Sequence, residues 1–452
     1  MSLRHSIVIL FAAAVLPGTL TGQTLSLADA LRLAERSAYT NRIAEADARA
    51  AEGRAGLALR GVLPTLRAEG GYVRTTDPLG AFGATLRQRS VTASAFEPAR
   101  LNEPAAIGNL SSALVVEQPI FNADAWFGRR AAVRAGAAAR AAESWARTGT
   151  QLDVVRAYYG AVLAGEAVQA LDSASRAAHS HQRVAESQHR NGVVTRSDAL
   201  LAAVRAGQVD ADLIAARGAA RLARARLAVA LGVPADTAVV LPERLPDTTA
   251  IASLAQVADS GAPLDRGDVR AASLAREAAA ADHQRTTALF LPRVNAFGRL
   301  DWNTPRTPFG GQDAWTAGVM VSWSPFSGGA ELAERRAASA RRDAADAALA
   351  AAAARGRLEL QEAANALEVA RARMAITGGA VGQSAEAHRI VARKYEGGLA
   401  TAVELFDAAA EETAARLGFA EARYQAIVAL AEGRRAAGQS LAILTSLEST
   451  ER

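Results

Sequence analysis

The feature that most constrains the fold is an internal repeat that spans most of the chain. Three pairs of segments correspond in the same order: LP at 63–64 with LP at 291–292, PIFN at 119–122 with SPFS at 324–327, and RNGVVTRSDALLA at 190–202 with EGGLATAVELFDA at 396–408. The two copies differ in length between the Leu-Pro and Phe motifs. Such ordered self-similarity indicates a duplicated structural unit with one variable loop.

Within each copy the residue pattern changes from helix to strand and back to helix. Residues 293–302 alternate between apolar and polar side chains, and residues 317–323 and, more weakly, 66–72 do the same. This period of two predicts strands, each close to the roughly 9–11 residues that cross a membrane as a tilted β-strand. Loops are predicted at about 75–109 and 303–314.

The segment after each Phe motif predicts two long helices. Residues 330–394 contain no Pro, so one continuous helix there would be roughly 100 Å long. Leu360, Leu367, Met374 and Val381 recur every seventh residue, which is typical of a coiled-coil seam. The many Ala residues along these helices favour close packing between helices.

The turn between the long helices has the same design in both copies. Gly192 and Gly398 are suited to the left-handed conformation that ends a helix. Thr195 with Asp198, and Thr401 with Glu404, have the spacing of a capping box that starts the next helix. Two sharp helical hairpin tips are therefore predicted.

Several protein classes are excluded by motif and composition. Lys394 is the only lysine, so there is no GxxxxGK phosphate loop, and HExxH, GxSxG and GxGxxG are absent as well. The chain has no Cys, and beyond the first 16 residues no apolar run of 18 residues indicates a spanning helix. We expect neither an enzyme nor a multi-helix inner-membrane protein.

The N-terminus reads as an export signal, because Arg4 and His5 precede an apolar run from Ile7 to Leu16 that is too short to span a bilayer. The following organisation is predicted: a signal peptide over 1–22, the first repeat over 23–231, an inter-repeat linker over 232–266, the second repeat over 267–438 and a C-terminal tail over 439–452.

Four amphipathic strands cannot close a barrel, and an open sheet edge is unfavourable in lipid. Closure therefore requires several copies of the chain. Three copies would supply twelve strands in a common cyclic symmetry.

The duplicated exported chain, its Leu-Pro strand openings, the PIFN and SPFS strand ends and the twin GVVT and GLAT tips resemble TolC-type outer membrane efflux proteins. The resemblance implies a mainly α protein with a small membrane β part. It would be a homotrimer with a twelve-stranded β-barrel, in contact with outer membrane lipid, that continues into a long α-helical barrel in the periplasm. Such a passive exit duct serves a tripartite efflux or type I secretion system. It docks to a periplasmic adaptor and, through the adaptor, to an inner-membrane pump.

The resemblance also assigns roles to residues at the hairpin tips. Glu404 and Asp407, with Asp198 from the first copy, match acidic positions at the channel entrance, and Tyr395 matches a tyrosine that helps to hold it shut. Ala400 occupies the position of the family's arginine, so the closing links of that residue are absent or replaced. The adaptor-contacting tips are predicted to comprise Gly192, Val193, Val194, Thr195, Gly398, Leu399, Ala400 and Thr401.

Simpler interpretations stay open for these residues. Asp198 and Glu404 are favoured at a helix start by capping and by the helix dipole, Asp407 suits a solvated face, and Tyr395 could pack at a helix end. Gly and Thr could merely build the turns. The alternative functions are a periplasmic adaptor or a structural coiled-coil scaffold without a lumen, although neither needs four alternating strands.

No cofactor, metal or nucleic acid is expected. His179 and His181 lie on different faces of a helix, and with His189 they make a poor set of metal ligands. The Arg pairs lie among Asp and Glu on helical faces, which favours solvated surfaces over nucleic-acid contacts.

Overall fold

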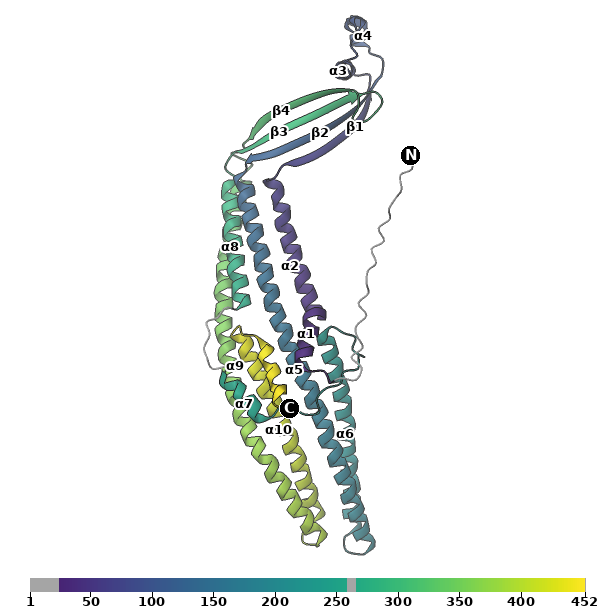
Figure 1. Ribbon diagram of the computed structural model, residues 1–452, viewed down its shortest axis with the longest axis vertical. Coiled ribbons are helices and arrows are strands. Elements are labelled where there is room, and N and C mark those ends of the chain that lie inside the picture. Colours follow the sequence, from purple (N-terminus) through teal and green to yellow (C-terminus); the bar gives the residue numbers. More distant parts are fainter. Residues whose placement is uncertain (1–23, 258–265, 452) are drawn as a thin grey trace. The chain divides into compact units, whose positions relative to one another are not determined.

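The structure, a computed structural model, describes residues 24–257 and 266–451. The predicted signal peptide and part of the inter-repeat linker, residues 258–265, lie outside the described residues. Within these limits the chain is mainly helical with one four-stranded antiparallel sheet (Figure 1). None of the described helices is long and apolar enough to cross a lipid bilayer.

The same order of elements occurs twice, as the sequence repeat predicts. The first copy contains α2 (Tyr39–Leu57), β1 (Thr65–Thr75), β2 (Ile107–Phe121), α5 (Ala123–Arg190) and α6 (Arg196–Leu231). The second contains α8 (Gly267–Ala288), β3 (Arg293–Thr304), β4 (Gln312–Ser322), α9 (Ala330–Glu396) and α10 (Ala402–Ala436). The shorter elements are α1 (Leu27–Ser37), η1 (Ala58–Gly61), α3 (Pro78–Arg87), η2 (Ala93–Phe96), α4 (Pro98–Asn102), α7 (Thr248–Val257) and η3 (Leu441–Glu451).

The described chain divides into two compact units. The sheet unit comprises residues 43–145 and 266–357, and the hairpin unit comprises residues 24–42, 146–257 and 358–451. Both α5 and α9 contribute residues to each unit.

The sheet unit contains the strands in the order β1-β2-β3-β4, so the two repeats meet where β2 pairs with β3 (Figure 1). The register of this pairing shifts between Pro119 and Phe121. Pro lacks the N–H that a ladder needs and is confined to edges and bulges, so the PIFN motif ends the regular pairing.

The two faces of this sheet differ in polarity because the strand period is two. The apolar face carries side chains that are exposed in a single chain: Leu66, Tyr72, Val116, Leu300, Trp315, Val319 and Val321. The opposite face carries charged side chains such as Arg67, Glu69, Glu117, Arg299 and Asp301. The predicted alternation is confirmed with one correction: β4 ends at Ser322, and the Trp323 indole instead donates to the Phe290 carbonyl at 3.1 Å.

The long connection between β1 and β2 is not a plain loop. Asp77 caps α3 by accepting a hydrogen bond from the Gly80 N–H at 2.6 Å, and Pro78 takes the first helical position. Arg89, after α3, donates to the carbonyl of Asp313, the second residue of β4, at 2.9 Å.

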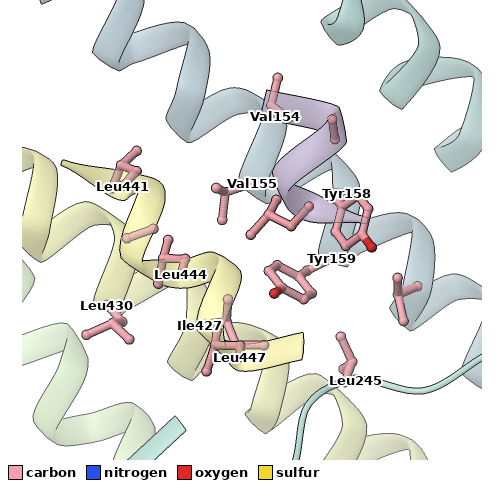
Figure 2. Packing of buried hydrophobic residues seen from close by; sticks show 14 of the residues in the cluster. Val154, Val155, Tyr158, Tyr159, Leu245, Ile427, Leu430, Leu441, Leu444 and Leu447 are labelled. Atoms are coloured by element: carbon pink, nitrogen blue, oxygen red, sulfur yellow. The ribbon is translucent and has the colours of Figure 1, made fainter. Parts of the chain in front are cut away.

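The main hydrophobic core lies in the hairpin unit. Figure 2 shows part of this core, in which Tyr159 of α5 points toward Ile427 of α10. The labelled members are Val154, Val155, Tyr158 and Tyr159 of α5, Ile427 and Leu430 of α10, Leu245 from the inter-repeat segment, and Leu441, Leu444 and Leu447 of η3. Met374 of the heptad seam is buried and Leu367 packs onto this cluster, whereas Leu360 is exposed.

The predicted C-terminal tail takes part in this core. Glu448 of η3 accepts hydrogen bonds from the Leu27 N–H, at 3.1 and 3.0 Å to its two carboxylate oxygens, and from the Tyr158 hydroxyl at 2.5 Å. A carboxylate at the start of α1 also complements the helix dipole. The first and last described elements, α1 and η3, are thus joined to each other and to α5.

Candidate functional site

The two hairpin tips have the same backbone geometry. Gly192 has φ of +73° and Gly398 has φ of +72°, in the left-handed region that other L-residues avoid. The turns close with hydrogen bonds from the Val193 N–H to the Gln188 carbonyl at 2.9 Å and from the Leu399 N–H to the Lys394 carbonyl at 2.8 Å. The predicted turn chemistry is confirmed at both tips.

A complete capping box starts each following helix. The Asp198 N–H donates to the Thr195 hydroxyl at 3.3 Å, and the Thr195 N–H donates to the Asp198 carboxylate at 3.1 Å. In the second tip the Glu404 N–H donates to the Thr401 hydroxyl at 3.3 Å, and the Thr401 N–H donates to the Glu404 carboxylate at 2.7 Å. Both acids therefore cap helices, whatever further role they have.

The capping bonds have an electrostatic consequence for the second tip. Hydrogen bonds from the Thr401 main chain and hydroxyl, with the nearby Lys394, lower the pKa of the Glu404 carboxyl below its usual value. Glu404 is thus ionised at neutral pH. Asp407, one turn further along α10, is exposed.

The two tips pack against each other within the hairpin unit. Their cluster, which we call the tip cluster, contains Ala185 of α5, Ala202 of α6, Tyr395 of α9, and Ala402, Leu405 and Phe406 of α10. Ala400 packs against it, and its methyl side chain cannot form a hydrogen bond. Val193 and Leu399 are not members of the cluster and are 63% and 82% exposed.

A cavity of about 410 Å³ lies between the tips. It is lined by Gln188, Gly192, Val193, Val194, Thr195, Asp198, Tyr395, Gly398, Ala400, Thr401 and Ala402. Almost the whole set of predicted tip residues is thus brought together with Asp198 and Tyr395. Leu399 lies outside this lining, and Glu404 and Asp407 are on the α10 side of the tip.

Tyr395 is buried at this cavity, yet its hydroxyl has no hydrogen-bond partner among the described residues. Burial, with a contribution from the Asp198 charge, raises the pKa of this hydroxyl. Tyr395 therefore contributes packing to the tip cluster and does not form a polar link to Asp198.

The polar face of the sheet is a second candidate site. Arg299 donates to Glu69 at 3.0 Å and to Asp301 at 2.8 Å, and Arg67 pairs with Glu117 at 3.4 Å. The pairs with Glu69 and Glu117 join different strands, whereas Arg299 and Asp301 are both on β3, and together they provide a charge-balanced surface opposite the apolar face.

The contacts of the histidines in the hairpin unit were only partly predicted from the sequence. His179 contacts Asp210 of α6 at 2.9 Å, whereas His181 packs against His388 of α9, so the two do lie on different faces. His388 was not recognised, because no local pattern connects it with His181. No group of three or more His, Asp or Glu in the described ranges could hold a metal ion.

Comparison with known proteins agrees with this architecture. Solved structures with a similar fold include the outer membrane protein VceC from Vibrio cholerae, with 20% identity over 92% of this chain and 96% of that chain and a TM-score of 0.75. The Campylobacter jejuni CmeC outer membrane channel has 15% identity, covers 100% of this chain and 97% of that chain, and has a TM-score of 0.74. A membrane protein from Pseudomonas aeruginosa has 20% identity over 91% and 93% of the two chains and a TM-score of 0.76.

Among curated protein sequences, none is significantly similar to this chain. The family model described as "Outer membrane efflux protein" matches residues 40–233 and 262–439, which is most of the chain and includes both repeats. The chain belongs to the outer membrane efflux protein family.

Proposed function

We propose that three copies of this efflux channel chain form one exit duct through the outer membrane, and that the hairpin tips dock a periplasmic adaptor. Through the adaptor the duct would serve an inner-membrane pump of a tripartite efflux or type I secretion system. The protein provides the passage, and the pump supplies energy and most of the selectivity.

The amphipathic sheet is the observation that carries this proposal. β1 and β4 are its outer strands and have no second strand partner in the described chain. Unpaired main-chain groups are costly in hydrocarbon, so the edges need partners from other copies. Twelve strands from three chains would direct the exposed apolar face to lipid and the ion-paired face to the lumen.

Neither alternative function accounts for this sheet. A periplasmic adaptor or a coiled-coil scaffold without a lumen works in water, where an exposed face bearing Trp315, Val319 and Val321 would promote aggregation. The ordered ion pairs on the other face would also have no purpose there.

The tips are the proposed adaptor surface because they present apolar side chains that the chain does not cover. Val193 and Leu399 are exposed at the turns, and the two capping boxes hold these turns in fixed geometry. Preorganised apolar anchors are typical of docking sites.

The acidic residues provide a proposed entrance. Glu404 and Asp407 are both exposed and lie three residues apart, hence on one face of α10. Three-fold symmetry would place six carboxylates around a narrow neck, with Asp198 nearby as a cap of the first hairpin.

Adaptor docking is tested with the double variant V193D/L399D. We expect normal trimer yield but loss of export and of cross-linking to a periplasmic adaptor. The matched control is S197D, which adds a carboxylate at an exposed position of the first turn of α6, where an acid is favoured, and removes no apolar surface. Export and cross-linking that survive in V193D/L399D would contradict the proposal.

A further inference from the structure

A pair of histidines joins the two repeats just beside the tip cluster. The ring centroids of His181 on α5 and His388 on α9 are 5.6 Å apart, with an angle of 72° between the ring planes. His181 lies one helical turn before Ala185, which is a buried member of the tip cluster, and His388 lies one turn before Ala392, which packs on it. The pair is therefore the next layer of the contact between the two hairpins.

The pair is poorly supplied with hydrogen-bond partners. Both Nε2 atoms are buried and have no partner among the described residues. On its other side, His388 Nδ1 lies 2.6 Å from the Glu412 carboxylate of α10, which also accepts a hydrogen bond from Arg416. Burial opposes ionisation of Glu412, but His388 and Arg416 hold the pKa of its carboxyl below the usual value. The proton of the shared bond is then on His388 Nδ1.

Other charged groups surround a cavity of about 490 Å³ that borders the pair. Those lining it are Arg205 and Asp212 of α6 and Asp407, Glu412 and Arg416 of α10, and Glu396 of α9 acts on His181 through its charge. His388 thus has a carboxylate in contact, whereas no anion among the described residues is in hydrogen-bonding contact with His181.

We propose that His181 and His388 form a proton-operated latch that holds the two hairpins together when at most one imidazole is charged and releases them when both are protonated. The Glu412 carboxylate lies against His388 and can balance a positive charge on that ring. A second proton, on His181, places two like charges side by side in a poorly hydrated contact. Separation of the hairpins would give both Nε2 atoms access to water.

The direction of the pH dependence follows from linkage. Burial, together with the neighbouring His388, lowers the pKa of His181 in the packed state below its ordinary value near 6.5. Protons therefore bind more tightly when the hairpins are apart. The contact is at full strength above the pKa of the separated imidazole and weakens as the pH falls toward the lowered pKa of the packed state.

A proton is a better fit to this pair than a metal ion. The described residues supply no third His, Asp or Glu in an arrangement that could complete a metal site. The latch is a property of one chain and does not depend on adaptor docking. If the tips line the entrance as proposed, acidification would open the neck.

The absence of native Cys makes the latch directly measurable. The full-length V193C/L399C protein is spin-labelled at both exposed tip positions, diluted with unlabelled copies and studied by pulsed electron paramagnetic resonance between pH 8 and 5. We expect a short distance at pH 8 and a growing population at longer distance below about pH 6.5. The ratio of separated to packed tips should rise up to about tenfold for every unit by which packing lowers the pKa of His181.

Two variants distinguish a latch from ordinary packing. H181Q and H388Q, each in the V193C/L399C background, cannot accumulate two charges and should keep the short distance throughout the pH range. H179Q is the matched control, since His179 is on the same helix but contacts Asp210 instead; it should respond like the parent protein. A parent protein without pH response, or an H181Q variant that keeps the full transition, would overturn the proposal.

Discussion

The hairpin unit buries its large apolar side chains, whereas the sheet unit leaves several of them exposed. Tyr158, Ile427 and Leu430 in the hairpin unit are almost completely buried, whereas Trp315 and Val319 in the sheet unit are 75% and 67% exposed. The hairpin unit therefore supplies its own hydrophobic stabilisation. In the proposed trimer, the sheet unit would obtain its hydrophobic stabilisation from lipid and from other copies of the chain.

The sequence therefore contains two sets of apolar residues with different roles. Side chains that α5, α10 and η3 bury against one another determine the stability of the single chain. Side chains on the apolar sheet face contribute little until the sheet reaches a membrane. Substitutions in the two units should consequently affect different steps of biogenesis.

The largest effect on stability is expected from I427A. Ile427 is fully buried in the core of Figure 2, so its truncation should lower the free energy of unfolding by about 2–5 kcal/mol. The matched variant V319A, on the exposed sheet face, should cost less than about 1 kcal/mol. Urea denaturation of both proteins in detergent, followed by circular dichroism, checks this; equal losses would break the comparison.

A somewhat smaller effect, confined to the membrane step, is expected from V319R. An Arg on the lipid face of a barrel costs about 2–4 kcal/mol near the midplane, so trimers in outer membranes should become scarce. M320R is the control, because Met320 is on the opposite, polar face of β4. Membrane fractions are compared by size exclusion with light scattering. If both proteins assemble equally, or if the native protein is a monodisperse monomer, the assignment of lipid and lumen faces is wrong.

Local chemistry made much of this architecture predictable from the sequence. Helix caps, left-handed glycines and strand alternation depend on residues within a few positions of each other. Thr195 with Asp198 was therefore enough to predict the start of α6, and the 293–302 pattern was enough to predict β3. The helices α3 and α4 were missed because short helices that follow Asp-Pro and Glu-Pro steps have no apolar periodicity of their own. The bonds from Leu27 to Glu448 and the packing of His181 on His388 were also missed, because only the tertiary fold brings such distant residues together.

The tips sharpen the comparison, since they belong to the hairpin unit but lie outside its main core. Loss of an N-cap hydroxyl usually costs about 0.5–2 kcal/mol. T401A and T195A should each cost about 1 kcal/mol, and T401S should restore the cap. Hydrogen exchange should become faster in the first turn of α10 or α6 alone; a loss of protection throughout the core would show that tip and core unfold together.

The smallest stability effect, and the clearest functional one, is expected from the entrance carboxylates. In E404Q/D407N the Gln can still accept the hydrogen bond of the capping box, while both negative charges are removed. Stability should hardly change, because Asp407 makes no capping bond and the cap at Thr401 is kept. If the carboxylates ring a constriction, cation over anion selectivity in bilayer recordings should fall on the order of a few-fold at low salt. Block by multivalent cations should weaken too, and both differences should shrink as salt screens the charges.

E404A supplies the contrast, since it removes the cap as well as the charge and should lose stability in addition. Selectivity and cation block that persist in E404Q/D407N at low salt would leave helix capping as the whole role of Glu404, and would leave Asp407 a solvated surface acid.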